Sequence, residues 1–427
     1  MGKALGQMGG TGSPQIEIEI GHSGVNWIAT ENPLSVSRFQ MVGAMDGNGN
    51  TLLIGGASYH APSSQTGVQI DRTNVDRLDQ VGGITQLANT FGAKPYYAAT
   101  DGNGAVLVMD NATCAVERYD LHGVHETLTP LPALRYEMTM QADGNGMVFV
   151  AGGLTSGYYN TVSEVYRYDA EGVRTTMPNL PYAPAYATGC TWNGRAVLVG
   201  GAGVYNSNTS YQSVIYGIDT QGSAKYLGSL NYALRAVGVA VDGNNRLVCA
   251  GGWNNSYQQG RNSVDCYDTE GVRTAMTPMI PARAEKCVGA SLADGSVIFM
   301  GGTTGTAVDC YDTEGVHSIY EAPTLREGGT VAQTRYANLT PNGNGLAVMS
   351  GMRAEPYTTA MNTMNILFFL GNGKQGLRRF DIPANASYKL RYDDAEKHSG
   401  PDGHKQIIMT PNEGYVRLGK MGRMVFG

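Results

Sequence analysis

Short apolar runs recur along the chain at regular intervals, and most of them end in a pair of glycines. The clearest copies are Leu53-Ile54-Gly55-Gly56, Val150-Ala151-Gly152-Gly153, Leu198-Val199-Gly200-Gly201, Cys249-Ala250-Gly251-Gly252 and Phe299-Met300-Gly301-Gly302. Degenerate copies occur at Val108–Asn111 and Val348–Gly351. Neighbouring copies are about 43 to 54 residues apart, which is the length of a four-stranded blade of a β-propeller. The hydrophobic pattern therefore predicts a ring of repeated β-sheets.

Polar turns keep the same phase as these apolar runs. A turn rich in Asp, Gly and Asn precedes the run at Asp46–Gly49, Asp101–Gly104, Asp143–Gly146, Asp242–Asn244 and Asn342–Gly345. A second turn follows the run at Tyr119–Val124, Tyr168–Val173, Tyr267–Val272 and Tyr311–Val316. Asp, Asn and Gly tolerate the positive φ angles that tight hairpins require, so both sets predict connections between neighbouring strands.

An arginine stands at the start of most repeats, after a segment that often contains Leu-Pro or Ile-Pro. These arginines are Arg38, Arg135, Arg235, Arg283 and Arg335. Together with the glycine pair and the Tyr-Asp turn, this order resembles the kelch repeat over roughly residues 37–366. Kelch repeats usually carry a tryptophan after the Tyr-Asp turn, where this chain has Val173, Val272 and Val316. The resemblance implies an all-β, kelch-like β-propeller of about seven four-stranded blades, with six to eight blades open.

The two ends of the chain predict how the ring is closed. Residues 1–14 form a flexible Gly-rich arm, and Gln15–Ile20 alternates as a strand does. We expect the propeller to span residues 15–370, with N-terminal strands completing the blade opened by Arg335–Gly351 and thereby removing exposed sheet edges. Residues 371–427 are a small C-terminal β segment. This segment supplies either extra blade strands, such as an eighth blade, or a separate appendage.

Composition narrows the choice of partners and compartment. Charged residues make up 15% of the chain, its net charge is −6, and it contains 59 glycines. This balance gives no electrostatic basis for binding nucleic acid or an anionic membrane. No apolar run approaches the roughly 20 residues of a membrane span, and the N-terminus lacks the apolar core of a secretory signal. The six cysteines stand singly, which favours buried free thiols. We expect a virion or cytoplasmic protein.

The connections of a propeller blade alternate between the two faces of the disc. Both sets of uniform polar turns fall on one face, while the longer, irregular loops after the glycine pairs share the other face with the arginines. These loops are rich in aromatic and amide side chains, which suit adaptable recognition and the stacking of sugar rings. The predicted ligand-binding residues are Tyr59, His60, Tyr158, Tyr159, Tyr205, Asn206, Tyr211, Trp253, Asn254, Tyr257 and Tyr357. The alternative is that these residues only build polar turns.

The repeated arginines permit two interpretations. The kelch resemblance implies that Arg38, Arg135, Arg235, Arg283 and Arg335 surround the mouth of the central channel, where they would hold carboxylates through paired hydrogen bonds. The other interpretation is that they donate hydrogen bonds to backbone carbonyls between blades. Two repeats carry Lys94 and Tyr186 in place of the arginine, so the ring would be incomplete.

The sequence supports a catalytic function less well than a binding function. The resemblance extends to copper radical oxidases, but the seven histidines show no paired metal-ligand spacing. It also extends to sialic-acid mutarotases, for which Arg235, Arg283, Glu137 and Glu285 are available. The turn Asp46–Asn50 resembles the start of a calcium loop but lacks its glycine and its closing glutamate. We therefore predict no catalytic residue, metal or cofactor.

The sequence favours a non-catalytic binding protein with a protein or glycan ligand. One hypothesis is a phage or virion protein, tail-associated or on the surface, that recognises host glycans or protein receptors and contacts other virion proteins. The second is an intracellular kelch-type adaptor for protein–protein interaction. A sugar-modifying enzyme such as a mutarotase ranks third.

Overall fold

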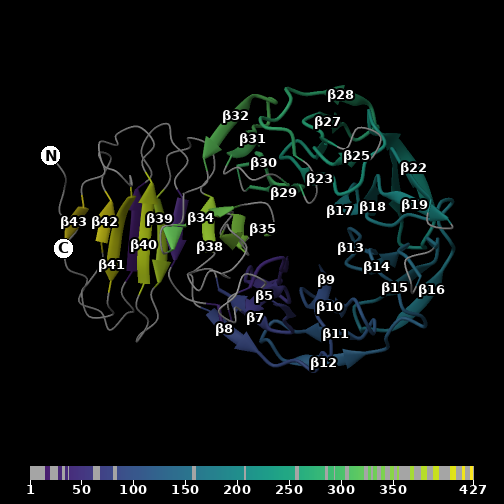
Figure 1. Cartoon of the computed structure of the whole chain (residues 1–427), viewed down its shortest axis with the longest axis horizontal. Helices are drawn as coiled ribbons and strands as arrows, with labels where there is room; N and C mark the ends of the chain where they lie inside the picture. Colours follow the sequence, from purple (N-terminus) through teal and green to yellow (C-terminus); the bar gives the residue numbers. More distant parts are fainter. Residues whose placement is uncertain are drawn as a thin grey trace.

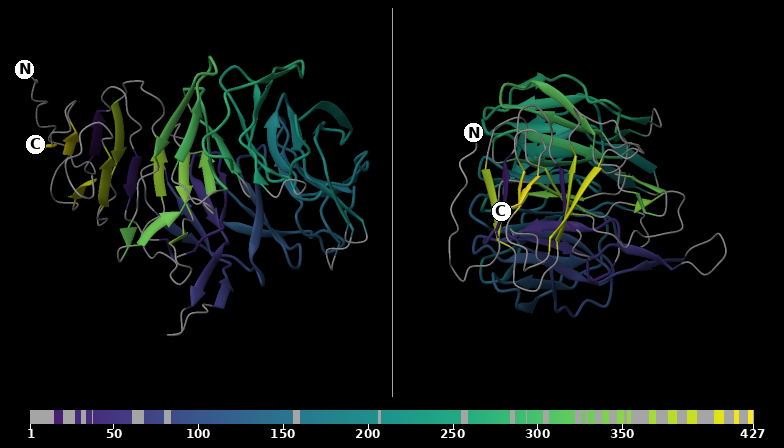
Figure 2. Two further views of the ribbon diagram at one scale, coloured as in Figure 1. Left: turned by 45° about the horizontal axis from the view of Figure 1, so that its top comes forward. Right: turned by 90° about the vertical axis from the view of Figure 1, so that its left-hand side faces the viewer.

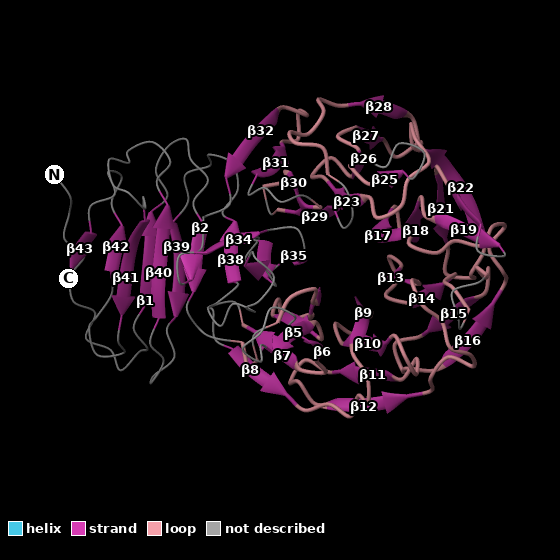
Figure 3. Ribbon diagram, in the orientation of Figure 1, coloured by secondary structure: helices cyan, strands magenta, loops and turns pink. Residues whose placement is uncertain are grey.

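All regular elements that can be described in this protein are β-strands (Figure 3). The computed structural model describes residues 15–19, 27–30, 34–36, 38–60, 68–79, 84–155, 160–205, 208–254, 259–283, 287–292, 294–302, 307–321, 326–327, 330–333, 338–341, 347–350, 353–354, 366–369, 377–381, 388–393, 404–409, 416–418 and 424–426. Within this part of the chain, no helix is long and apolar enough to cross a membrane.

Six four-stranded sheets stand around a central channel as the blades of a β-propeller (Figure 1). From the channel outwards, the first three blades are β3 (Val42–Met45), β4 (Thr51–Ile54), β7 (Val75–Leu78), β8 (Ile84–Leu87); β9 (Pro95–Thr100), β10 (Val106–Asp110), β11 (Val116–Tyr119), β12 (His125–Leu128); and β13 (Thr139–Ala142), β14 (Val148–Ala151), β15 (Val165–Tyr168), β16 (Arg174–Met177).

The next three blades repeat this arrangement. They are β17 (Thr188–Trp192), β18 (Arg195–Val199), β21 (Val214–Ile218), β22 (Ala224–Ser229); β23 (Gly238–Val241), β24 (Leu247–Ala250), β27 (Val264–Tyr267), β28 (Arg273–Ala275); and β29 (Cys287–Ser291), β30 (Val297–Gly301), β31 (Ala307–Tyr311), β32 (His317–Glu321).

The expected number of about seven four-stranded blades is corrected to six. The place between the sixth blade and the first is filled by a six-stranded sheet, whose inner strand contacts both β29 and β3. Its strands, in order, are β35 (Asn338–Pro341), β36 (Ala347–Ser350), β38 (Ile366–Phe369), β2 (Trp27–Thr30), β40 (Tyr388–Asp393) and β41 (His404–Met409). The two outermost strands prolong the sheet beyond a blade, and they carry it out of the disc towards the chain ends (Figure 1).

Of the two N-terminal strands that the structure describes, one joins this closing sheet. Strand β2 pairs with β38, so the C-terminal part of the chain already supplies the third strand and leaves a single position open. The strand Gln15–Glu19 (β1), which the sequence placed in the closing blade, pairs instead with β39 (Leu377–Asp381) and β42 (Val416–Leu418). With β43 (Met424–Phe426), these strands form a separate four-stranded sheet. Residues 1–14 lie outside the described part of the chain.

The hydrophobic core lies between neighbouring blades rather than within any one of them. The second strand of a blade is buried on both faces, and its alternate side chains enter opposite cores. In β10, Val106 and Val108 pack against the first blade, whereas Leu107 and Met109 pack against the third. Because both faces are covered, these strands read as continuous apolar runs rather than as an alternating pattern.

The glycine pairs lie where other backbone segments approach closely, from the same blade and from the next one. Gly152 and Gly153 have φ angles of 69° and 100°, which favour glycine. A Cβ atom on Gly153 would lie 2.8 Å from the carbonyl oxygen of Tyr136, and one on Gly152 would collide with the carbonyl of Pro184. The pair therefore allows the chain to leave the core strand while the following blade packs against its backbone.

Candidate functional site

The two faces of the disc differ in how their connections are built. The turns between the first and second strands and between the third and fourth strands lie on one face, which we call the turn face. The connections between the second and third strands lie on the other, the loop face. Three of these form extra hairpins: β5 (Ala57–His60) with β6 (Val68–Asp71), β19 (Ala202–Tyr205) with β20 (Asn208–Tyr211), and β25 (Trp253–Asn254) with β26 (Gln259–Gly260). Figure 2 shows β5–β6, in purple, projecting away from the disc.

The turns of the turn face form hydrogen bonds that hold neighbouring blades together. The backbone N–H of Gly47 donates to Gly104 of the next blade at 2.8 Å, and Gly102 and Gly243 make the same bond to their neighbours. The Asn48 side chain donates to Leu121 across the same boundary at 3.2 Å. Asp46 in turn accepts the backbone N–H groups of Asn48 and Asn50 at 2.9 and 2.8 Å. The Asp-Gly-Asn pattern is thus explained by turn geometry and contacts between blades.

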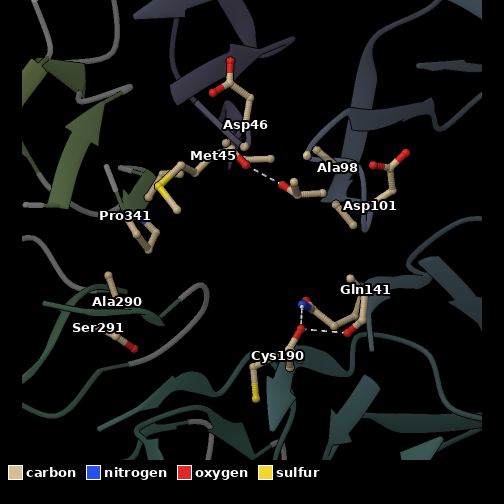
Figure 4. A pocket seen from close by; sticks show the side chains of 18 of the residues that line it. Met45, Asp46, Ala98, Asp101, Gln141, Cys190, Ala290, Ser291 and Pro341 are labelled. Carbon is tan, nitrogen blue, oxygen red and sulfur yellow. Dashed lines mark hydrogen bonds between the residues drawn. The ribbon is translucent and has the colours of Figure 1, made fainter. Parts of the chain in front are cut away.

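The central channel opens on the turn face into a cavity of about 1030 Å³ (Figure 4). Short side chains and turn backbone line most of it, including Ala98 and Ala290. Its polar side chains are largely engaged within the protein, since Gln141 donates to Thr191 at 3.1 Å and the Asp101 carboxylate accepts from Arg118, outside the lining, at 2.7 Å. This wide opening presents few side chains that would select a ligand.

A second cavity, of about 570 Å³, occupies the channel mouth on the loop face, and we call it the loop-side cavity. It shares Ala98, Gln141 and Gly189 with the turn-side cavity, so the two lie along one channel. Its lining combines tyrosine rings, amides, hydroxyls, methionines and two opposite charges. The side chains relevant here are those of Gln40, Met41, Tyr96, Tyr97, Glu137, Met138, Thr139, Gln141, Tyr186, Thr188 and Arg235.

Four lining residues hold an unusual backbone conformation. Gln40, Glu137, Tyr186 and Ala236 have φ angles of 54°, 53°, 57° and 52°, in the left-handed region. Each follows the residue that bridges to the start of a loop-face connection, so they are equivalent positions in four blades. Such a conformation costs about 1–2 kcal/mol for a residue with a side chain. Strained residues of this kind cluster at binding and active sites.

Hydrogen bonds between blades compensate for this strain. The N–H of Tyr186 donates to the carbonyl of Glu137 at 3.0 Å, and the N–H of Ala236 donates to the carbonyl of Tyr186 at 3.2 Å. These bonds join three successive blades around the channel mouth. They fix the direction in which the side chains of Glu137 and Tyr186 leave the backbone, so the cavity lining is held in place before any ligand arrives.

Arg235 is the positive charge of the loop-side cavity. Its guanidinium lies over the Tyr186 ring, 4.8 Å from the centroid, and 5.9 Å from the ring centroid of Tyr211. The backbone of Arg235 pairs with Trp253 of the β25–β26 hairpin in both directions, at 3.1 and 2.9 Å. Among the residues predicted at the channel mouth or on the loop face, the structure brings Arg235, Tyr211 and Trp253 together.

The other predicted arginines that the structure describes line neither cavity. Arg38 is 1% exposed and donates to the carbonyls of Asn74 and Leu53 at 2.7 and 3.0 Å, and to the Asp76 carboxylate at 2.7 Å. Arg283 makes the same set with Gly301, Ala307 and Asp309. Arg135 is 5% exposed and pairs with Glu164 at 2.9 Å. Their guanidinium groups fasten strands within a blade and do not face the channel. Arg335 lies outside the described residues.

The loop-face prediction divides in a similar way. Asn254 is buried and donates to the carbonyl of Ala233 at 2.7 Å, which gives it a structural role. Tyr59 and His60 lie on β5 and Tyr205 lies on β19, in the hairpins of the loop face, although their side chains are not described. The remaining predicted residues, Tyr158, Tyr159, Asn206, Tyr257 and Tyr357, lie outside the described residues.

Two ionisable groups of the loop-side cavity stay protonated at neutral pH. Burial and the nearby Glu137 charge raise the pKa of Tyr97 well above its usual value, and burial raises that of Cys287 to about 12. The Tyr97 hydroxyl accepts the Met138 N–H at 3.4 Å. Tyr97 therefore offers a neutral phenol beside a carboxylate. In the part of the chain that is described, no three His, Cys, Asp or Glu residues gather as a metal site.

The sequence did not single out Gln40, Tyr96 or Tyr97, and it connected Glu137 and Tyr186 with the channel only through minor alternatives. Their common feature is their position just after the start of each repeat. A non-glycine residue in the left-handed conformation leaves no mark in composition or periodicity, because the hydrogen bonds that permit it come from another blade. Aligning the repeats at single-residue precision would have identified Gln40 and Glu137 as equivalent.

Comparison with known proteins adds the fold but no family. A scan of protein families finds no match to this chain, and a search of curated proteins finds none. A solved streptogramin B lyase structure is 13% identical, covers 81% of this chain and 98% of its own, and has a TM-score of 0.54. A selenomethionine-substituted virginiamycin B lyase from Staphylococcus aureus is 13% identical, covers 80% and 99%, and also has a TM-score of 0.54.

A third solved structure is a catalytically inactive virginiamycin B lyase from Staphylococcus aureus with quinupristin. It is 13% identical, covers 81% of this chain and all of its own, 100%, with a TM-score of 0.53. At this level of identity the likeness shows a shared β-propeller fold and carries no activity over to this chain.

Proposed function

We propose that this protein is a non-catalytic, kelch-type binding protein that takes its ligand in the loop-side cavity. The observation that carries the proposal is the difference between the two channel mouths. On the turn face, the turn backbone and the Asn side chains bind the neighbouring blades. On the loop face, Tyr96, Tyr186 and Arg235 are partly accessible and line a cavity bordered by a hairpin. Rigid aromatic planes with amides beside them give contact area at low entropic cost.

The ligand that suits this lining is a glycan or a protein segment. Sugar rings stack their apolar faces on tyrosine, while Gln40, Gln141, Thr139 and Thr188 supply amides and hydroxyls for their polar edges. In this proposal the protein belongs to the surface or tail of a phage or virion and recognises host receptors. The low share of charged residues and the hairpins that project from one face support that setting.

A binding screen tests the proposal directly. The purified protein is applied to a printed array of glycans and host surface proteins, together with the variants Tyr186→Ala and Tyr226→Ala. Tyr186 lies in the cavity, whereas Tyr226 lies on the outer strand β22 and is 53% exposed. Removing an aromatic residue from the centre of a binding site should weaken binding about tenfold or more.

The Tyr226→Ala variant should retain the binding of the original protein. If Tyr186→Ala binds every ligand as well as the original protein does, the loop-side cavity is not the binding site. Co-sedimentation of the protein with purified particles, followed by detection on the particle surface, tests the virion setting separately.

A sugar-modifying or lyase-type enzyme is a second candidate for the same cavity. It is favoured by Glu137, which lies near the protonated phenol of Tyr97 and could exchange a proton with a bound substrate. The solved structures that share the fold include enzymes described as lyases. Turnover of a bound ligand, lost in Glu137→Gln while binding is kept, would favour this candidate over simple binding.

A further inference from the structure

Arg235 differs from the other described arginines at the start of repeats in having no oxygen acceptor in the described part of the chain. Arg38, Arg135 and Arg283 each bind a carboxylate within their own blade. The guanidinium of Arg235 makes ring contacts instead, with Tyr186 and Tyr211. A planar cation that lies on aromatic faces keeps its N–H donors free at the edge of the plane.

A displacement of one residue explains this difference. The isolated β-bridges align Arg235 with Phe39 and Tyr136, each of which comes one residue after the buried arginine of its repeat. The position of the buried arginine is filled here by Leu234, which is 2% exposed and belongs to the core. Successive side chains of an extended segment point to opposite sides, so the shift turns the guanidinium away from the acceptors that bind the buried arginines. Arg235 itself lines the loop-side cavity.

The surroundings of Arg235 are held rigid. Its backbone is paired with Trp253, and the next residue, Ala236, is bound to Tyr186 of the neighbouring blade at 3.2 Å. The two rings therefore restrain a side chain whose backbone cannot shift. A donor group that is oriented before binding loses less entropy when a ligand arrives, which makes a charged hydrogen bond more effective.

The charges of the cavity define what an incoming group must carry. Among the described residues of its lining, Arg235 and Glu137 are the charged ones, and the other described side chains are neutral. Guanidinium and carboxylate groups form paired, charge-assisted hydrogen bonds. A single negative charge at Arg235 is favoured there, whereas a second one nearby would be opposed by Glu137. Amides, hydroxyls and tyrosine rings on the rest of the wall match the hydroxyls and apolar face of a sugar.

We propose that the loop-side cavity binds an acidic sugar and that Arg235 receives its carboxylate. This inference rests on the proposed function and names the class of ligand for the same site. Tyr186 positions the guanidinium beneath the ligand, and the neutral wall formed by Gln40, Gln141 and Thr188 meets the sugar hydroxyls. Acidic peptides would use the same charge but would leave these neutral groups without sugar hydroxyls to bind.

The experiment uses matched pairs of ligands. The full-length protein is applied to printed glycans that carry a uronic acid, each paired with the same glycan after reduction of its carboxyl group to an alcohol. Peptides in pairs that differ by Glu and Gln are printed beside them. We expect the uronic acid glycans to bind and their reduced partners to bind about tenfold or more weakly, since a hydrogen bond to a charged group is stronger than one to a neutral group.

The variants separate Arg235 from a general effect of charge. Arg235→Met keeps most of the apolar stem and removes the guanidinium, so it should bind acidic and reduced glycans equally. Arg174→Met is the matched control, because Arg174 also lies over a tyrosine ring, that of Tyr166 at 5.8 Å, but on the outer strand β16. This control should keep the preference for acidic glycans. Thermal melts of both variants check that each is folded.

The possible outcomes distinguish this inference from the proposed function. Binding that depends on Tyr186 but shows no preference for the acidic partner overturns the acidic sugar and leaves the binding site standing. Selective binding of the Glu peptides, with no glycan bound, overturns it in favour of an acidic peptide. A preference that survives in Arg235→Met also overturns the role of Arg235. Absence of any binding that depends on Tyr186 overturns both proposals.

Discussion

Buried arginines join neighbouring strands inside several blades through hydrogen bonds and ion pairs. Arg38 joins the second and third strands of its blade through Leu53 and Asp76, and it is almost fully enclosed. Burial lowers the pKa of its guanidinium to about 10, and the Asp76 carboxylate opposes that shift. A buried cation of this kind depends on its anionic partner, because an unpaired charge in the interior is costly.

Replacing that partner should therefore destabilise the protein. Asp76→Asn leaves Arg38 without a counter-charge and should lower the free energy of unfolding by about 3–5 kcal/mol, measured by urea denaturation. The control is Asp219→Asn, whose partner Arg195 lies 3.6 Å away at a partly exposed site. That change should cost at most about 1 kcal/mol. Equal losses in the two variants would contradict the role assigned to the buried pair.

The arginines also show how far the sequence could define the site. Both interpretations of their role were open, because a repeated arginine is equally consistent with a buried side chain that joins strands and with one that contacts a ligand. The spacing of the repeats is variable, so the one-residue shift of Arg235 could not be read without the β-bridge that aligns it with Phe39. A change of one residue along an extended segment reverses the direction of the side chain.

At the scale of the strand and the hairpin, the polar turns within the described residues were predicted correctly because their cause is local, while the predicted turn at Asn342–Gly345 lies outside those residues. Asp101 accepts the N–H groups of Asn103 and Ala105, both at 2.9 Å, and a two-residue sequence pattern is enough to reveal such a turn. Contacts between turns of different blades were not predictable in the same way. Gly104 carries a φ of 77°, and a Cβ atom there would lie 2.6 Å from the Cα of Gly47.

The contact between these turns can be separated from the cost of backbone strain. Gly104→Ala should destabilise more than Gly194→Ala, because Gly194 has a similar φ of 70° but open space around its Cβ position. The second variant should cost about 1–2 kcal/mol for the left-handed backbone alone. The first should cost that amount plus the clash with Gly47, which chemical denaturation would measure as an additional loss. Matching values would show that the turns of adjacent blades can separate without penalty.

For the whole molecule, the periodicity predicted a propeller but not the form of its closure. Each of the six blades is built from one continuous segment of the chain, and its strands lie in the sheet in the order in which they occur in the sequence. The closing sheet draws β2 and β38 from opposite ends of the chain, and β40 and β41 add strands that no repeat contains. Pairing between distant segments depends on the completed ring, so the repeat length alone could not distinguish seven blades from six and a larger sheet.

Because cysteine thiols are buried across the ring, the stability of the folded protein should fall at alkaline pH. The six cysteines are free thiols, and burial raises the pKa of Cys190, Cys287 and Cys310 from 9.0 to about 12. The folded state therefore keeps protons that the unfolded chain releases. Its stability is complete below about pH 9 and is lost as the pH rises towards 12.

Urea midpoints measured between about pH 7 and pH 12 should be constant up to about pH 9 and should then fall steadily. At about pH 8 a thiol-specific reagent should react slowly with the five buried cysteines of the folded protein, more readily with the partly exposed Cys190, and with all six cysteines once the protein is unfolded. Rapid labelling of the five buried cysteines in the folded protein, or a midpoint that does not change above pH 9, would contradict their burial.

At the left-handed positions of the channel mouth, the backbone conformation stays the same while the identity of the side chain varies. Hydrogen bonds between blades stabilise the backbone there, while the side chains are as different as glutamine, glutamate, tyrosine and alanine at Gln40, Glu137, Tyr186 and Ala236. Four of the blades thus each contribute one exchangeable contact to a common pocket. Specificity could change one blade at a time, by evolution or by design, without rebuilding the ring that supports it.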